Sequence, residues 1–355
     1  MPFIAQLEPD ALLAAFMQQP PRGFTAEISS QGMPTFLASF DVLTTADDAL
    51  RRRIAGLPGY RRWGGVLRWR TRFAGTTVSE YAPLPSTVAP MELARGLKRD
   101  YGHECRLLIV KDIAQDSPLL DAAANAHARA FAAACEAQDY VLLEGQALAW
   151  VPIDFASSDE YLARLSPARR KNIRRKLRSR VNLEIEAVAT GHPCFQDGAA
   201  LAAFQALFDN VYEQSEIHFD HLEAEFFRVV MQDATSGGIV FVYRHAGEMI
   251  GWNLCYEHGG KLIDKYVGFA YPQAREHNLY FVSWMHNLEH ARRRGLTHYV
   301  AGWTDPQVKS FLGARMTFTR HAVYARNPLL RALLRRIGGH FEGDRQLLAA
   351  GQSDE

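Results

Sequence analysis

A short polar segment before an apolar helix carries side chains suited to holding an anionic or carbonyl group. It spans residues 270–278 and contains Arg275, His277 and Asn278, with a helix predicted from Leu279. The first N–H groups of a helix have no partner within the helix, so they attract anions and carbonyl oxygens. We therefore expect free backbone N–H groups here, with Arg275 and His277 able to contact phosphate. In the plainer interpretation, Asn278 only caps the helix and Arg275 is a solvated loop residue.

A second polar group lies between two predicted helices, over residues 212–221. It concentrates the titratable side chains Glu213, Glu216, His218, Asp220 and His221. Such groups can recognise an amine or take a proton from it. No HExxH-type spacing is present, so we predict no metal site. A polar helix connection is the plainer interpretation of the same residues.

A basic helix opened by Pro167 is the strongest concentration of charge in the chain. Its cations are Arg169, Arg170, Lys171, Arg174, Arg175, Lys176, Arg178 and Arg180. One interpretation is a platform for a polyanion such as tRNA. The other is a solvated helix whose aliphatic stems cover apolar surface. The net charge of the whole chain is only +1, which favours the second interpretation.

The elements that position these groups follow a simple order in the second half of the chain. Residues 238–269 predict three antiparallel strands with turns at Ala246-Gly247 and Gly259-Gly260. The loop, a helix ended by Gly295, and the strand LTHYVAGW then complete a strand–loop–helix–strand unit. Other predicted elements are a strand in VNLEIEAV, helices over 201–214 and 223–233, a last strand around MTFTRHAVYA and a basic helix from Asn327-Pro328.

The first half of the chain is predicted to mix helices and strands without a chemical motif. Helices are expected over residues 10–18, 46–57, 91–101 and 118–138. Strands are expected on both sides of the Gln31-Gly32 turn, in VLRWRTRFAGTTVSEYAP and in CRLLIVKDI, with two short strands in VLLEGQALAWVPID.

Composition sets the class of protein. The chain has 355 residues, of which 48% are hydrophobic, so two lobes are expected. Four scattered cysteines without a CxxC pair indicate a reducing compartment. The N-terminus lacks the features of a signal peptide, and no apolar run is long enough for a membrane span. We expect a cytoplasmic protein.

Three passages, in this order, resemble the FemAB-like branch of the GNAT acyltransferase superfamily, including its peptidoglycan biosynthesis/recognition-type members. DEYLARLSPARRKNIRRKLRS is similar to the L-S-x-x-x-R-x-x-x-R-R helix, and DKYVGF with NLYF to R-Y-W-G…L-H-F-E. AGWTDPQVKSFLGARMTFTRHAVY is similar to G-A-Q-G-E-H-K-x-x-R-G-F…T-x-S-x-H, matched by Gly302, Lys309, Gly313, Ala314, Thr319 and His321. The resemblance covers residues 157–324.

The resemblance implies an α/β fold (mixed α+β) of tandem GNAT-like lobes, the second with a meander and the strand–loop–helix–strand crossover. It divides the chain into a degenerate N-terminal lobe (1–150), a catalytic lobe (151–342) and a polar tail (343–355). The implied reaction is direct transfer of an acyl group from an activated carrier to an amine, without a covalent enzyme intermediate.

The resemblance also assigns donor-binding residues. The strand edge of Lys265, Tyr266, Val267 and Gly268, up to Phe269, is expected to hold the donor's carbonyl and arm. Residues 273–278 are expected to surround its phosphates. After the last crossover strand come Trp303, Asp305 and Lys309, and Lys309 matches the family's lysine for contact with phosphate or carboxylate.

Catalytic roles follow from the same resemblance. Asp264 is the candidate general base, and because neighbours alternate along a strand, only one of Asp264 and Lys265 is expected to face the cleft. Tyr280 takes the position of the family's histidine and is the candidate acid for the leaving group. The 212–221 segment is expected to shape the acceptor site, with Glu213 and His218 as further acid–base candidates and Asp220 as a binding residue.

The donor loop departs from the superfamily. The usual acetyl-CoA loop is Q/R-x-x-G-x-G/A, and with Gln273 in first place its two small residues become Glu276 and Asn278. Glycine lets the backbone approach a pyrophosphate, and Glu276 adds a negative charge there. These departures argue against a small acyl-CoA held in the usual pose. From the resemblance, the expected donor is acyl-CoA or another acyl carrier such as an acyl-carrier protein, used as co-substrate, with no permanently bound cofactor.

Two alternative functions remain beside this acyltransferase. One is a FemAB-type transferase that uses aminoacyl-tRNA, which the near-neutral charge disfavours. The other is a non-enzymatic binding module on a degenerate GNAT fold. The expected acceptor is an amine-bearing small molecule or peptide, and the sequence leaves its identity and the oligomeric state open.

Overall fold

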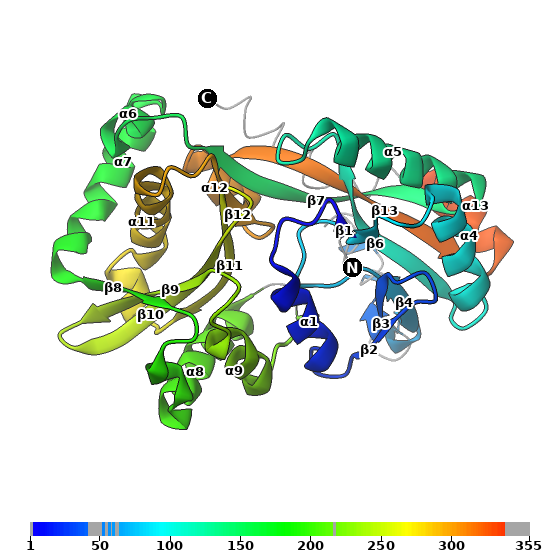
Figure 1. Cartoon of the computed structure of the whole chain (residues 1–355), viewed down its shortest axis with the longest axis horizontal. Coiled ribbons are helices and arrows are strands. Elements are labelled where there is room, and N and C mark those ends of the chain that lie inside the picture. The colour runs from blue at the N-terminus through cyan, green and yellow to red at the C-terminus, as the bar shows by residue number, and fades with distance from the viewer. Residues whose placement is uncertain are drawn as a thin grey trace. The chain divides into compact units, whose positions relative to one another are not determined.

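The computed structural model describes residues 3–41, 52–53, 56–57, 59–60, 64–215 and 218–337 (Figure 1). Contacts divide the chain into two compact units. The first comprises residues 1–6, 16–148 and 317–355, and the second residues 7–15 and 149–316. These units differ from the predicted division, because residues 7–15 lie with the second unit and the chain from Thr317 onward lies with the first. The predicted tail, and most of the helix predicted over 46–57, lie outside the described residues.

The first unit is built on a sheet with strand order β2-β3-β4-β6-β13-β7. Its strands are β2 (Thr25–Ile28), β3 (Pro34–Asp41), β4 (Arg68–Ala74), β6 (Leu107–Gln115), β13 (Arg315–Ala325, from Thr317) and β7 (Val141–Pro152, up to Leu148), with β1 (Phe3–Ile4) and β5 (Leu84–Pro85) forming a separate pair. Its helices are η1 (Gly64–Leu67), α4 (Pro90–Tyr101), α5 (Ala122–Ala137) and α13 (Pro328–Ile337). Helix α1 (Asp10–Gln18) begins in the second unit and ends in the first.

The hairpin predicted around Gln31-Gly32 is confirmed as the antiparallel pair β2 and β3. Gly32 takes a left-handed φ of +83° in the turn, which glycine adopts without a Cβ penalty. The rings of Phe36 on β3 and Phe73 on β4 stack with centroids 4.8 Å apart, so these two paired strands also contribute side chains to the core.

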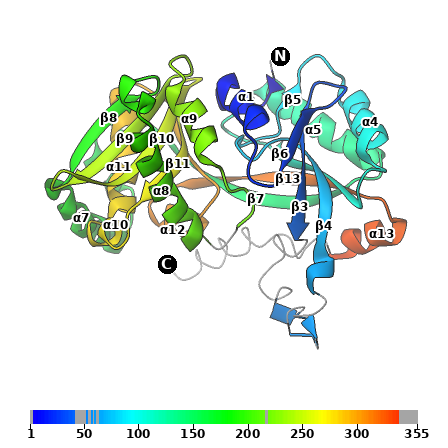
Figure 2. The same cartoon turned by 90° about the horizontal axis from the view of Figure 1, so that it is seen from below.

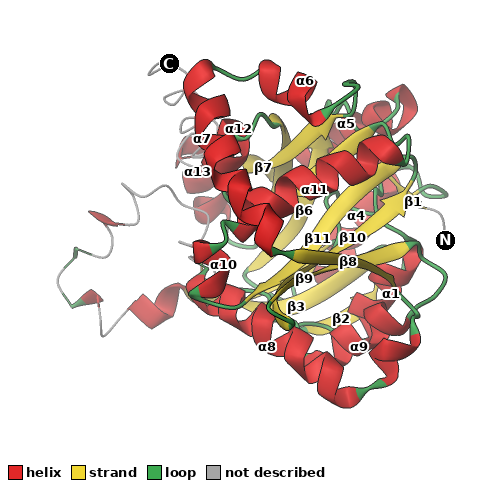
Figure 3. Cartoon of the chain, turned by 90° about the vertical axis from the view of Figure 1, so that its left-hand side faces the viewer, coloured by secondary structure: helices red, strands yellow, loops and turns green. Residues whose placement is uncertain are grey.

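The second unit carries the strands β8 (Glu184–Ala189), β9 (Gly238–His245), β10 (Glu248–His258), β11 (Lys261–Phe269) and β12 (His298–Gly302), with the end of β7 beside β12. Its helices are α6 (Ser158–Ala163), α7 (Pro167–Leu177), η2 (Arg178–Asn182), η3 (Pro193–Gln196), α8 (Gly198–Gln214), α9 (Ala224–Gln232), α10 (Gln273–Glu276), α11 (Leu279–Arg293) and α12 (Pro306–Phe311). Helices α7 and α11 lie on one face of the β8–β11 sheet, and α8 and α9 lie on the other (Figure 3).

Both units repeat one order of elements. In the second unit the antiparallel strands β9, β10 and β11 are followed by α11 and by β12, which is parallel to β11. In the first unit β2, β3 and β4 are followed by α4 and by β6, which is parallel to β4. The predicted fold class, mixed α/β with tandem GNAT-like lobes, is confirmed.

Two predicted elements are wrong. VLLEGQALAWVPID forms the single strand β7, not two short strands, because its residues pair continuously as part of the sheet. The segment over 270–278, predicted as a loop, contains the one-turn helix α10. Local apolar periodicity is too weak in either segment to show this.

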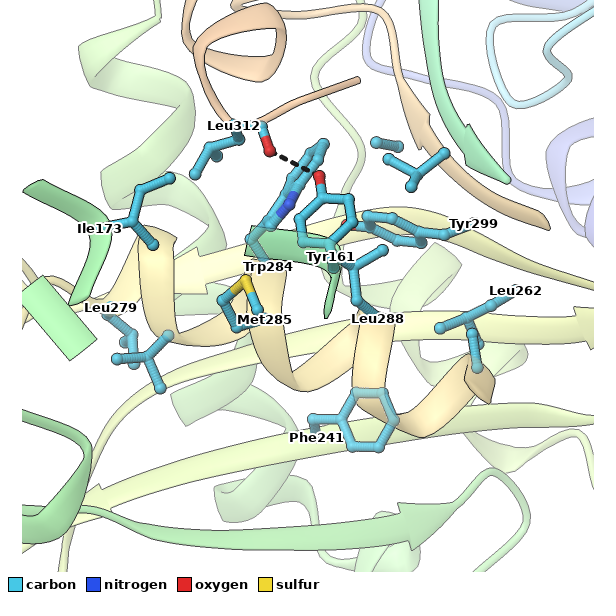
Figure 4. Close-up of a cluster of buried hydrophobic side chains, with 14 of the residues drawn as sticks. Tyr161, Ile173, Phe241, Leu262, Leu279, Trp284, Met285, Leu288, Tyr299 and Leu312 are labelled. Atoms are coloured by element: carbon cyan, nitrogen blue, oxygen red, sulfur yellow. Dashed lines mark hydrogen bonds between the residues drawn. The ribbon is translucent and has the colours of Figure 1, made fainter. Parts of the chain in front are cut away.

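The core of the second unit surrounds α11 (Figure 4). Leu279, Met285 and Leu288 of this helix pack with Ile173 of α7 and with side chains of the sheet. The Tyr161 hydroxyl of α6 donates a hydrogen bond of 2.5 Å to the Leu312 carbonyl oxygen (Figure 4). This bond ties the segment after α12 to the layer of helices over the sheet, which fixes α12 and its lysine.

Candidate acyl-transfer site

The strands β11 and β12 separate after a short parallel pairing. Their register covers only Lys261–Ile263 opposite His298–Val300, although β11 continues to Phe269. Beyond Ile263 the two strands are no longer paired, and the opening between them is called the fork. The candidate residue Asp264 stands directly at this fork.

Asp264 accepts three hydrogen bonds at the fork. Asn253 Nδ2 lies 2.6 Å from Oδ1, while the Tyr299 hydroxyl and Asn287 Nδ2 lie 2.7 and 3.2 Å from Oδ2. A further bond of 2.7 Å joins Asn287 Nδ2 to Asn253 Oδ1. The donors come from β10, β12 and α11, so three elements hold the carboxylate in one orientation.

Burial raises the pKa of the Asp264 carboxyl above its ordinary value. The hydrogen bonds from Tyr299 and Asn253 oppose this rise, as do the positive charges of Lys309 and Lys265. A carboxyl with a raised pKa and fixed orientation has the properties of a general base. The raised pKa makes it a better proton acceptor than an exposed aspartate.

Two buried lysines lie close enough to Asp264 for their positive charges to lower the pKa of its carboxyl. Lys309 on α12 is only 5% exposed, and a methyl group placed on Gly302 would lie 3.8 Å from its Nζ and 3.9 Å from the Asp264 carbonyl oxygen. Lys265 Nζ lies 3.4 Å from Glu8 Oε1, with side chains 6% and 0% exposed. The fork therefore holds a compact set of buried opposite charges, which require one another because an unpaired buried charge is costly.

Tyr280 stands in the first turn of α11, as predicted. Its hydroxyl is buried and has no hydrogen-bond partner among the described residues. Burial, followed by the negative charges of Asp305 and Asp264, raises the pKa of Tyr280. The hydroxyl therefore keeps its proton and can act as a proton donor.

The amides of residues 274–278 are not free, which differs from what was expected of this part of the donor loop. The N–H groups of residues 274–278 donate to the carbonyl oxygens of Ala270, Pro272, Pro272, Gln273 and Arg275, at 2.8 to 3.2 Å. The turn of α10 thus uses the amides that were expected to hold phosphate. Asn278 is not a side-chain cap either: it has a left-handed φ of 49°, and its carbonyl oxygen accepts the N–H groups of Phe281 and Val282.

The two basic side chains of this loop also have contacts within the protein. The Arg275 guanidinium donates to Gln214 Oε1 and lies 4.9 Å from the ring centroid of Tyr271. The His277 ring lies 4.1 Å from that of His245. A phosphate contact would therefore replace or share these interactions, and the assignment of both residues as donor ligands stays a prediction.

The remaining donor-edge residues lie on β11. Tyr266 packs against Phe226 and Phe227 of α9, with ring centroids 5.7 and 5.5 Å away. Val267 packs against the α11 core instead. Gly268 is buried, and a methyl group placed there would lie 2.1 Å from Trp252 Nε1, so its glycine is required by the indole ring. Trp303 lies half-buried between β12 and α12.

The acceptor candidates lie at the end of α8. Glu213 and His218 are exposed, and the His218 ring packs edge-on against Tyr212 at 5.1 Å. Asp220 is half-buried, and Glu216 lies outside the described residues. A neighbouring ion pair joins His221 Nε2 to Asp209 Oδ1 at 2.9 Å. No hydrogen bond described for Glu213 or His218 connects them to Asp264, so their catalytic role stays a prediction.

Sequence reasoning missed the residues that orient Asp264. Asn253, Asn287 and Tyr299 are buried, and Glu8 balances Lys265 from the N-terminal segment. A signal was available for the two asparagines, because each interrupts an apolar pattern: WNLCY on β10 and WMHNLEH on α11. A fully buried amide requires partners, and so it marks a polar network.

The fold and the fork define an acyltransferase class of structure. Residues 167–310 match the family model of the acetyltransferase (GNAT) domain, and the chain thus carries a GNAT domain, as predicted. No curated protein matches the sequence significantly. No helix among the described residues has both the length and the apolar character that a membrane crossing requires.

Solved structures resemble nearly the whole described fold. The C-terminal domain of a putative lysylphosphatidylglycerol synthetase from Agrobacterium fabrum is 13% identical, with 92% of this chain and 95% of that chain covered and a TM-score of 0.53. L-PGS from Bacillus licheniformis is 11% identical over 94% and 98%, with a TM-score of 0.53. FemX is 11% identical over 91% and 97%, with a TM-score of 0.51. This likeness is one of fold.

Proposed function

We propose that the second unit transfers an acyl group from an activated carrier to an amine at the β11–β12 fork. The observation that carries this proposal is the group of Asp264, Lys309 and Tyr280, which can supply a base, a cation and an acid. The Lys309 side chain is buried, and burial raises the pKa of both Asp264 and Tyr280. Acyl transfer to an amine needs one group of each kind.

In this reaction Asp264 takes a proton from the acceptor ammonium, and the amine nitrogen attacks the donor's carbonyl carbon. A C–N bond forms, and the carbonyl oxygen becomes negative in the tetrahedral intermediate. The Lys309 ammonium and the backbone of β11 stabilise that oxygen. The bond to the carrier then breaks, and its thiolate or alkoxide takes the proton of Tyr280. The new amide nitrogen gives its second proton to the Tyr280 phenolate, which restores the hydroxyl.

An exchange of Asp264 for asparagine tests the base. We expect Asp264→Asn to lower kcat about 100-fold or more, because general-base catalysis contributes on that order, while donor binding persists. Glu213→Gln and His218→Gln are matched controls, since both side chains are exposed; they should change kcat by about twofold or less. Unchanged turnover in Asp264→Asn would move the base to Glu213 or His218.

A screen of candidate acyl donors identifies which carrier the protein uses. Purified protein is incubated with acyl-CoAs of increasing chain length, or with acyl-carrier proteins, and a panel of primary amines, and products are measured by mass spectrometry. Thermal shift with the same donors reports binding without turnover. Neither binding nor transfer with any donor would favour the non-enzymatic binding module.

A second candidate function, aminoacyl transfer from tRNA, is supported by the donor loop. The amides of residues 274–278 are engaged within the loop, which removes a cradle for the pyrophosphate of CoA. Helix α7 in the same unit exposes Lys171 and Arg175, and η2, which follows it directly, exposes Arg178. A large polyanion bound on such a helix does not require the loop amides.

Gel shift with total tRNA at rising salt tests this second candidate. Replacing Lys171, Arg175 and Arg178 by glutamine should weaken binding and reduce the salt slope by about 0.7–0.9 per lost phosphate contact. Arg228→Gln on α9 is the control, because this exposed arginine is already paired with Glu225. Absence of a shift at low salt would remove the candidate.

A further inference from the structure

Helix α13 exposes apolar side chains beside a cluster of arginines. Leu329 is 79% exposed and Leu333 is 51% exposed, one helical turn apart. The other large apolar side chains exposed among the described residues lie on separate elements, so α13 alone there presents two together. The helix follows directly on β13 at the rim of the first unit (Figure 2).

The helix is attached to its unit by its opposite side. The Arg331 guanidinium lies 5.1 Å from the Tyr324 ring centroid and donates to the Ala325 carbonyl oxygen at 2.9 Å. Leu330 and Leu334 are half-buried on the same side. These contacts of Arg331, Leu330 and Leu334 fix the orientation of α13. Leu329 and Leu333 lie on the other side of the helix and are therefore exposed.

The segment that contains α13 carries only positive charge. Residues 326–337 contain four arginines and no acidic residue, whereas the whole chain has a net charge of +1. Arg335 and Arg336 are exposed next to the two leucines. Exposed leucines bordered by arginines are the pattern of helices that lie in the interface of an anionic membrane.

The contrast with α7 separates lipid from nucleic acid. Helix α7 is also very basic, but its one buried apolar residue, Ile173, faces inward, and none of its side chains is a large exposed apolar group. The phosphates of a nucleic acid bind arginine favourably, but an exposed leucine adds nothing to that binding. Leucines gain free energy only where apolar surface leaves water.

We propose that α13 docks this protein onto an anionic lipid surface, with Leu329 and Leu333 entering the acyl boundary and Arg335 and Arg336 contacting lipid phosphates. The proposal concerns the first unit and does not depend on the transfer activity. Two leucines give a weak, reversible association, strengthened by each arginine near a negative surface.

Vesicle flotation with the full chain tests the proposal. We expect binding to phosphatidylcholine vesicles that contain about 30% phosphatidylglycerol, and little binding to phosphatidylcholine alone. The double variant Leu329→Ser/Leu333→Ser should weaken binding about tenfold or more. Arg335→Gln/Arg336→Gln should weaken it by a similar factor, and about 0.5 M salt should do the same to the unmodified protein.

The matched control is Val181→Ser in η2, since Val181 is 86% exposed and follows the basic helix α7. It should bind vesicles like the unmodified protein, and melting curves should show every variant folded. No flotation of the unmodified protein would overturn the proposal and indicate that another segment or a protein covers the leucines. Loss of binding in the arginine variant but not in the leucine variant would also overturn it, because it would indicate a general polyanion surface.

Discussion

Removing the Tyr299 hydroxyl tests whether the Asp264 network holds a charged carboxylate. In Tyr299→Phe the 2.7 Å bond to Asp264 Oδ2 is lost. Asn287 Nδ2 loses its 3.2 Å contact with the hydroxyl but keeps Asn253 Oδ1 at 2.7 Å. The substitution therefore removes one donor from the carboxylate and leaves no other side-chain donor of the network without a partner.

The free energy of unfolding lost in Tyr299→Phe depends on whether Asp264 is charged. A hydrogen bond to a charged group contributes about 1.5–3 kcal/mol, and one between neutral groups about 0.5–1.5 kcal/mol. The ordinary pKa of 3.8 is raised by burial in the folded state, so ionised Asp264 lowers stability as the pH rises through the raised value. Tyr299→Phe raises this folded pKa further, by about one unit for each 1.36 kcal/mol lost. The cost of the substitution must therefore grow with pH.

Urea unfolding at several pH values measures this cost. We expect a loss of about 1.5–3 kcal/mol near neutral pH, falling to about 0.5–1.5 kcal/mol where Asp264 is protonated. Tyr243→Phe is the control, because this fully buried hydroxyl has no hydrogen-bond partner among the described residues. The reasoning is refuted if both variants lose the same free energy, or if the loss in Tyr299→Phe does not change with pH.

Two further substitutions probe the same unit by thermal melting. Gly268→Ala should cost about 1–3 kcal/mol of stability by overpacking, because its methyl group would lie 2.1 Å from Trp252 Nε1. Gly247→Ala should cost about 1 kcal/mol, because its φ is +83° although nothing lies within 4 Å of the added methyl group. Equal costs for the two variants would contradict the crowding at Gly268. Burial, with repulsion from Arg180, His290 and Arg293, lowers the pKa of His286 to about 3, so the protein should lose stability as the pH falls below about 6.5, and His286→Leu should flatten that loss. An unchanged pH profile would place the acid sensitivity elsewhere.

Local sequence signals were sufficient for most of the elements. The helix over 10–18, the turns at Ala246-Gly247 and Gly259-Gly260 and the crossover helix all follow from caps, glycines and apolar period. The fold could be predicted because the order of these elements was distinctive. Strand β7 could not, since its continuity depends on neighbours in the sheet that are distant in sequence.

The site could be predicted only in part, because its partners are brought together by the fold. Asp264, Tyr280 and Lys309 were proposed from the resemblance to the family, and their roles stay predictions. Asn253, Asn287 and Glu8 come from separate elements, and no local spacing connects them to Asp264. The donor loop was misjudged for a related reason: a single turn of helix within it uses its own amides.

A bulge in β11 interrupts the strand alternation that the sequence analysis assumed. The register with β10 places Tyr266 opposite Leu254 and Asp264 opposite Cys255, so Lys265 is an extra residue. Before the bulge Leu262 and Asp264 face α11, and after it Val267 and Phe269 do so, which turns Tyr266 toward α9. Strict alternation would place Asp264 and Tyr266 on one face and force a choice between Asp264 and Lys265. The bulge instead lets one short stretch supply a carboxylate to the α11 face and a tyrosine to the α9 face, with a buried lysine between them. Without the bulge, Asp264 and Tyr266 would lie on the same face of the strand.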